Sequence, residues 1–223
     1  TLDGGAGNDT FQIGQLYGSQ RLPTNLTASD AFDTIATTRG YLSRGATMPV
    51  VAQGGDGNDA FVVYSNQAEL RLEGDGGDDS FIVRGFALAQ VDPVSGNIVT
   101  GPGGNAVPLT SGLTSTGAPL NVNPGAGNNT VQYNVNAPVS IDGGAGFDTV
   151  TVLGTEFPDN FVITDEGVFG AGVNLRYQNV EALEIDALER EDDFYILPPP
   201  AGMTKRVIAG RGSHTLHVGG DRD

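Results

Sequence analysis

Five glycine-rich segments of the chain end in an acidic or amide side chain and lead into a short apolar run. They read GGAGND (4–9), GGDGND (54–59), GDGGDD (74–79), PGAGNN (124–129) and GGAGFD (143–148). Because glycine tolerates positive φ, each segment can turn sharply and direct several carbonyl oxygens inward. Carbonyl and carboxylate oxygens are the ligands that Ca²⁺ prefers, at six or more per ion. We therefore predict calcium sites where two such corners stack.

The spacing of these corners indicates a repeat array. Weaker copies follow at 187–195 and 209–217, and the intervals between corners alternate between about 50 and about 20 residues. Two corners thus form a unit of about 70 residues, which predicts a single array of three units, 1–72, 73–141 and 142–223. The long intervals contain polar insertions, for which we expect irregular structure at 14–47 and a loop at 100–119.

The residues after each corner alternate between large apolar and small or polar types, as in a strand with one buried face. We interpret 180–188 as strand as well, because its apolar residues do not fix a helical period. Together these patterns predict an all-β fold, a right-handed parallel β-solenoid with Gly-Asp calcium corners and long loop insertions. The residues predicted to point inward are Phe11, Ile13, Phe61, Val63, Phe81, Val83, Val131, Tyr133, Val150, Val152, Phe194, Ile196, Leu216 and Val218.

The composition excludes several classes of protein. The 223 residues include 34 Gly, 27 Asp or Glu and only 11 Lys or Arg, a formal net charge of −16. Such a chain is repelled by nucleic acid. Cysteine is absent, which excludes disulfides and thiolate metal sites. No apolar run is long enough for a membrane helix, and we predict no membrane insertion. The sequence begins within a motif, so we interpret it as a fragment of a longer repeat protein.

The corners resemble the GGxGxDxUx nonapeptides of the RTX (repeats-in-toxin, hemolysin-type) proteins. This resemblance implies a parallel β-roll with Ca²⁺ between adjacent turns, secretion, and calcium-dependent folding outside the cell. It covers about a third of the chain. Carried over by position, it implies these metal-binding residues: the motif positions Asp9, Asp59, Asp79, Asn129 and Asp148, the turn positions Asp56, Asn58, Asp75 and Asp78, and the glycines Gly54, Gly74 and Gly76.

The chain departs from the RTX pattern in ways that rank these sites. The motif recurs on only one side of each predicted coil, Asn129 replaces one aspartate and His214 another. We expect the strongest site between the Asp59 and Asp79 corners and a weaker one between Asn129 and Asp148. For Asp192 and His214 we expect no metal. The alternative for every corner is a plain turn without an ion.

Other chemistry has less support in the sequence. His214 and His217 lack any zinc-protease frame, and we interpret them as surface residues, as we do Asp192 and Asp193. No catalytic or cofactor-binding motif occurs, so we do not expect an enzyme. We predict a calcium-binding structural module of a secreted or bacterial cell-surface protein of the adhesin, matrix or surface-layer type. Its expected partners are neighbouring repeats of the same or identical chains, through homo-assembly into fibres.

One alternative stays open. The chain could be a catalytic or non-catalytic module of a secreted polysaccharide-acting enzyme, of the lyase or epimerase type, because Arg71 and Arg84 flank an acidic corner.

Overall fold

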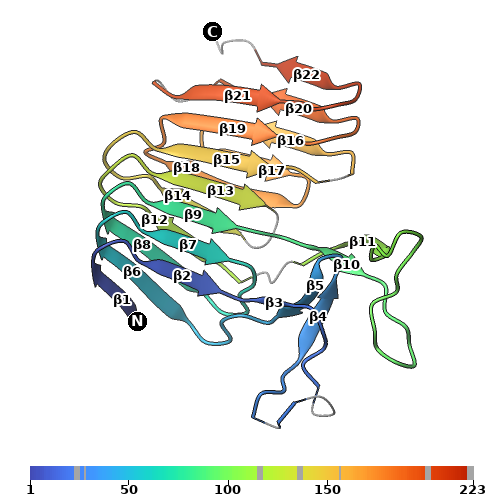
Figure 1. Cartoon of the computed structure of the whole chain (residues 1–223). Coiled ribbons are helices and arrows are strands. Elements are labelled where there is room, and N and C mark those ends of the chain that lie inside the picture. Colours follow the sequence, from blue (N-terminus) through green and yellow to red (C-terminus); the bar gives the residue numbers. More distant parts are fainter. Residues whose placement is uncertain are drawn as a thin grey trace.

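The structure, a computed structural model, describes residues 1–22, 26–27, 29–114, 118–134, 138–155, 157–198 and 202–219. Within these ranges the fold is all-β, without a helix. Accordingly, nothing in the described part of the chain provides a helix able to cross a membrane. The strands form two large sheets and one smaller side sheet (Figure 1).

The first large sheet has ten strands and is parallel except around β17, which is antiparallel to both of its neighbours. In spatial order its strands are β1 (Leu2–Ala6), β6 (Val50–Asp56), β8 (Leu70–Gly76), β12 (Leu120–Asn123), β14 (Val139–Asp142), β18 (Val173–Gln178), β17 (Gly167–Gly170), β16 (Asn160–Ile163), β20 (Asp193–Ile196) and β22 (Thr215–Val218).

The second large sheet has seven strands, all parallel. In order they are β2 (Thr10–Ile13), β7 (Ala60–Val63), β9 (Ser80–Val83), β13 (Thr130–Asn134), β15 (Thr149–Leu153), β19 (Ala182–Asp186) and β21 (Thr204–Ile208). The strand predicted within 180–188 is therefore confirmed.

The chain passes back and forth between the two large sheets, which defines two edges. At the first edge it leaves the ten-stranded sheet for the seven-stranded one, as at 57–59 and 77–79. At the second edge it returns, as at 64–69 and 187–192. This alternation with parallel pairing is compatible with a β-solenoid.

The apolar core lies between the two large sheets and follows the predicted alternation. Phe61, Phe81 and Phe194 are fully buried. Phe11, Phe61 and Phe81 stack ring on ring, with centroids 4.9 and 4.6 Å apart. The prediction is wrong for Leu216 and Val218, which are 51% and 73% exposed, because β22 pairs only with β20 and no described strand covers its other side.

The long insertions are more ordered than expected. Together they build a five-stranded antiparallel side sheet that projects from the right of Figure 1. Its order is β11 (Pro108–Leu113), β10 (Ala87–Ala89), β4 (Thr34–Thr37), β5 (Gly40–Ser43) and β3 (Leu16–Tyr17). The expectation of irregular structure at 14–47 was wrong because β5 pairs with both β3 and β4 within this insertion, and Leu88 of the second insertion pairs with Thr37. The expectation of a loop at 100–119 was wrong for β11, which pairs with β10. Both insertions leave the solenoid-like body at the second edge.

Candidate functional site

The acidic corners of the first edge form a continuous hydrogen-bonded row, which we call the inner ladder. Its members are Asp9, Asp59, Asp79, Asn129, Asp148 and Glu181. In each step the backbone N–H of one corner donates to the side-chain oxygen of the next corner along the chain. The donor–acceptor distances from Asp9 onward are 2.7, 2.7, 2.8, 3.0 and 2.8 Å. Each side chain from Asp59 to Glu181 therefore caps a backbone amide that would otherwise be unpaired at a turn.

A second row, the outer ladder, runs along the surface of the same edge in the opposite sense. Its members are Asn8, Asn58, Asp78 and Asn128. Here each side-chain oxygen accepts a hydrogen bond from the N–H of the following corner. The N–H of Asn58 donates to Asn8 over 2.9 Å, that of Asp78 to Asn58 over 3.0 Å, and that of Asn128 to Asp78 over 2.7 Å. The row ends where the N–H of Phe147 donates to Asn128 over 3.1 Å. Each central corner is thus bonded to both of its neighbours.

The first glycine of the motif is required by the inner aspartate. Oδ2 of Asp59 lies against Gly54, and Oδ2 of Asp79 lies against Gly74, so that a methyl group on either glycine would overlap the carboxylate. At the fourth corner this glycine is Pro124, and there the aspartate is replaced by Asn129. Gly54 and Gly74, predicted as metal-binding residues, therefore have a steric role: they leave room for the carboxylate oxygen.

The fourth residue of the motif is glycine because the corners stack backbone on backbone. Gly57 and Gly127 have φ of 135° and 140°, which L side chains rarely adopt. A methyl group at either position would also overlap the carbonyl of the preceding corner, that of Gly7 or Gly77. The tight stack is what brings the inner side chains within hydrogen-bonding distance of their neighbours.

Burial dominates the electrostatics of the inner ladder. Asp59, Asp79 and Asp148 are at most 3% exposed. Burial raises the pKa of Asp79, against the effect of its hydrogen bond with the Asp59 amide, and the charge of Asp59 raises it further. The pKa of Asp148 is likewise raised by burial. Oδ2 of each of these three carboxylates is buried without a hydrogen-bond partner.

The predicted calcium residues therefore divide into two groups. The motif positions meet in the inner ladder. The side chains of Asp56, Asn58, Asp75 and Asp78 are instead exposed on the outside of the corners, away from the buried oxygens. Gly76 contributes its carbonyl to the Gly57 amide at 2.8 Å. The side-chain oxygens of the turn positions therefore do not lie close enough to the inner-ladder oxygens to share one metal ion with them.

The donor chemistry of the inner ladder suits a hard cation, because unpartnered buried oxygens recur from corner to corner. The side chains alone do not complete a site. In the described ranges no three or more Asp, Glu, His or Cys side chains gather where they could hold a metal. A Ca²⁺ ion at Asp59 and Asp79 would need backbone carbonyls for its remaining ligands.

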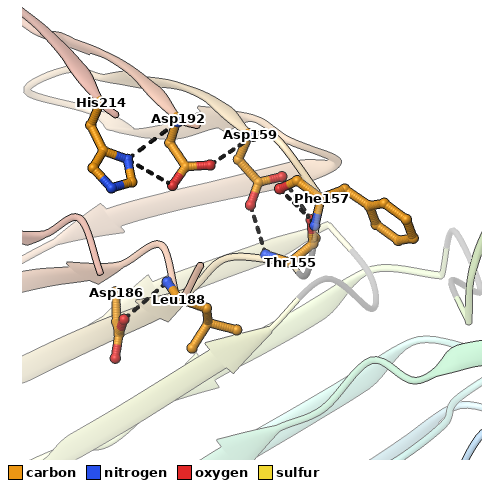
Figure 2. A network of polar contacts seen from close by, with 7 residues as sticks. All are labelled: Thr155, Phe157, Asp159, Asp186, Leu188, Asp192 and His214. Atoms are coloured by element: carbon orange, nitrogen blue, oxygen red, sulfur yellow. Dashed lines mark hydrogen bonds and ion pairs between the residues drawn. The ribbon is translucent and has the colours of Figure 1, made fainter. Parts of the chain in front are cut away.

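The second edge repeats the inner-ladder chemistry in its C-terminal part (Figure 2). The N–H of Asp159 donates to Oδ1 of Asp192 at 2.9 Å, and the N–H of Asp192 lies 3.3 Å from Nδ1 of His214. Asp159 accepts from both the N–H and the hydroxyl of Thr155, at 2.7 and 2.8 Å. Burial raises its pKa, and the two hydrogen bonds from Thr155 oppose that shift.

The interpretation of Asp192 and His214 as surface residues was wrong. Asp192 is 1% exposed, and the His214 side chain only 9%. Nδ1 of His214 also lies 3.2 Å from Oδ2 of Asp192. This nitrogen can accept the Asp192 amide when unprotonated or donate to the carboxylate when protonated, but not both at once. The two weak motif copies, assigned to the same side as the others, lie instead at the second edge.

Two contributors were missed by the sequence reasoning. Asp159 has a detectable signal, since Gly154 precedes it by the same five residues that separate Gly54 from Asp59. Glu181 has none, because its corner is short and lacks glycine. Its carboxylate reaches the Asp148 amide only because β18 and β19 follow β14 and β15 in the two sheets.

The arrangement can therefore cap buried amides along two edges and offers a row of buried oxygens at the first. Comparison with known proteins gave no family, no curated protein and no solved structure that matches this chain.

Proposed function

We propose that this chain is a structural repeat module, a right-handed parallel β-solenoid that acts as a stiff, acidic spacer in a secreted or cell-surface protein of the RTX type. The observation that supports this best is the inner ladder, which links six successive corners without interruption. A ladder of this kind resists local opening, because separating two coils between the Asp9 and Asp148 corners breaks the sheet pairing and both corner ladders together.

The proposal is tested by small-angle X-ray scattering and thermal unfolding of the whole chain. We expect an elongated particle and one cooperative transition for the coils. A flexible particle, or the coils melting one after another over a broad range, would contradict a stiff spacer.

We propose further that Ca²⁺ binds at the inner ladder, with Asp59 and Asp79 as its carboxylate ligands. The supporting observation is the unpartnered buried Oδ2 of each residue in a chain of net charge −16. Extracellular Ca²⁺ sites commonly have dissociation constants of about 10⁻⁴ to 10⁻³ M. At ten times the dissociation constant, each site would add about 1.4 kcal/mol to the free energy of unfolding.

The calcium proposal is separated from the capping role by exchanging Asp59 and Asp79 together for asparagine. Asparagine keeps the Oδ1 that accepts the neighbouring amide, as Asn129 does at the next corner. It removes the charge that a cation needs. We expect the double variant to stay folded and to lose the rise in melting temperature that Ca²⁺ gives the natural chain.

The measurement is calorimetric titration with Ca²⁺ after EDTA treatment, with Mg²⁺ as the control ion and Asp33→Asn as the control variant. Asp33 is exposed in the insertion that precedes β4. If Ca²⁺ leaves the melting temperature of the natural chain unchanged, the calcium proposal fails and the spacer proposal stands. If the double variant responds to Ca²⁺ like the natural chain, Asp59 and Asp79 are not the ligands.

We propose that the partners of the module are neighbouring repeats, from this chain or from an identical one. Among the described strands, β22 pairs on one side only and exposes the apolar side chains of Leu216 and Val218. Light scattering over a range of concentrations tests this idea, with Leu216→Lys as the disrupting variant. A natural chain that stays monomeric at every concentration would argue against assembly of identical chains.

A further inference from the structure

A pocket of about 690 Å³ lies between the side sheet and the second edge. The side sheet contributes Arg39 in the turn between β4 and β5, and Phe86 just before β10. The second edge contributes Phe157 from the 154–159 corner and Leu188 and Arg190 from the 187–192 corner. The pocket is thus formed where the two insertions meet the part of the second edge that carries Asp159 and Asp192.

The charged side chains among the described lining residues of this pocket are basic, whereas the chain as a whole is acidic. Acidic residues outnumber basic ones by 27 to 11 in the sequence, yet no Asp or Glu is among the described residues that line the pocket. Two arginines are. The side chains of Arg39 and Arg190 are exposed and form no ion pair within the described ranges, whereas Arg71, Arg176 and Arg206 each lie beside a glutamate. The pocket is therefore suited to an anion.

The backbone of the 187–192 corner gives an independent reason to regard the pocket as functional. Leu188 and Arg190 have φ of 67° and 109°, at the positions where the 124–129, 143–148 and 209–214 corners have glycine. A residue with a side chain is strained in this conformation, and such strain gathers at functional sites. Both strained residues line the pocket, and Figure 2 shows Leu188 near Thr155 on the neighbouring corner.

The remaining walls indicate the shape of the anion. Phe157 is 43% exposed, and Phe86 is held edge-on against Tyr64 with ring centroids 5.4 Å apart. These faces suit the apolar face of a ring. The exposed amide of Asn105 also borders the pocket and can bond a hydroxyl. A guanidinium group binds a carboxylate through two parallel hydrogen bonds.

We propose that this pocket binds a carboxylated ring, the chemistry of an acidic sugar unit, with the carboxylate on Arg39 and Arg190 and the ring against Phe157 and Phe86. This function is additional to that of a structural module and independent of calcium. A rigid spacer with such a pocket can attach to an acidic polysaccharide without acting on it.

The test is calorimetric titration of the whole chain with three small molecules. D-Glucuronate carries the carboxylate and the hydroxyls, D-glucose lacks the carboxylate, and cyclohexanecarboxylate lacks the hydroxyls. We expect glucuronate to bind at least tenfold more tightly than either of the others. Equal binding of glucose would overturn the role of the arginines, and tighter binding of cyclohexanecarboxylate would overturn the assignment to a sugar.

Two variants locate the site. Arg190→Gly removes the guanidinium and restores the residue that other corners have there, so the corner can keep its shape. We expect this variant and Arg39→Ala each to weaken glucuronate binding at least tenfold, and Arg71→Gln, outside the pocket, to leave it unchanged. Amide NMR shifts on glucuronate binding should centre on Gly85 and Gly154, which line the pocket. No binding by the natural chain, or binding that both pocket variants retain, would overturn the proposal.

Discussion

The two edges of the molecule use the same capping chemistry for different purposes. At the first edge, corners of nearly constant sequence stack backbone on backbone, and the fourth position of all five glycine-rich corners is glycine, as at Gly57 and Gly127. At the second edge, Asp192 and His214 accept the amide of the preceding corner in the same way. Gly210 and Gly212 stack there as closely as the first-edge glycines, but Leu188 and Arg190 replace glycine in the 187–192 corner. The difference teaches that the aspartate fixes the corner, whereas the glycines fix only the spacing between backbones.

The two edges also differ in where the insertions lie. Both insertions and the pocket that they help to form lie at the second edge, while the first edge has no insertion between β6 and β15. Between β6 and β15 the first edge is thus the uninterrupted side of the fold, and the second edge is the side from which the insertions and their surfaces project.

The largest effect should come from adding a methyl group within the first edge. Gly127→Ala places that group on the carbonyl of Gly77 at a φ of 140°. We expect a loss of at least about 3 kcal/mol in the free energy of unfolding, because backbone strain and overlap combine.

Urea denaturation measures this loss, and Gly103→Ala is the matched control. Gly103 has a φ of 86°, but it lies in a side loop where no atom is closer than 3.8 Å to the added group. It should lose only about 1 kcal/mol. Equal losses would show that strain alone, and not close stacking, requires the glycines.

The next largest effect should distinguish the two ladders. Asp79→Ala leaves the buried amide of Asp59 without its acceptor and should reduce the free energy of unfolding by about 2 kcal/mol. Asp78→Ala removes an acceptor of the exposed ladder, where water can replace it, and should cost less than about 0.5 kcal/mol. Similar values for the two variants would mean that burial does not distinguish the ladders.

A smaller effect of the opposite sign is expected at the second edge. Arg190→Gly removes a strained side chain at a φ of 109° and should raise the free energy of unfolding by about 0.5 to 1 kcal/mol. Thermal unfolding without added ligand measures the gain. A loss of stability would show that Arg190 supports the fold, and that the comparison between strained and glycine-rich corners is mistaken.

The smallest effect concerns pH. Burial raises the pKa of Asp159 above its ordinary value, so the folded state takes up a proton more readily than the unfolded state. The contribution of this group to stability is therefore present below pH 3.8 and is lost as the pH rises through the folded-state pKa. Asp159→Asn keeps an acceptor for Thr155 and should make the melting temperature fall less between pH 4 and 7. An unchanged slope would contradict the shifted pKa.

Much of the first edge could be predicted from the sequence. Alternation located the buried faces, since Phe61 and Val63 point inward while Ala60 and Val62 do not. The motif also located the inner aspartates. The sequence did not reveal what those aspartates contact, because the acceptor of each amide belongs to the next corner, 19 to 50 residues away.

The sequence did not predict that the C-terminal motif copies lie at the second edge. The corners that end in Asp159, Asp192 and His214 precede strands of the ten-stranded sheet, β16, β20 and β22, whereas the glycine-rich corners of the first edge precede strands of the seven-stranded sheet. Sequence spacing does not show on which side a corner falls. The side sheet was equally hidden, because β4 and β10 pair across more than 40 intervening residues.

The opposite sense of the two first-edge ladders gives the stack a direction of growth. In the inner ladder the acceptor of each amide comes later in the chain than the amide, whereas in the outer ladder the acceptor comes earlier. A chain that emerges from its N-terminal end can therefore dock each new corner on existing Asn or Asp acceptors at the surface. The buried hydrogen bond of the preceding corner forms once the new corner has docked, so the coils should assemble in order from the N-terminal end.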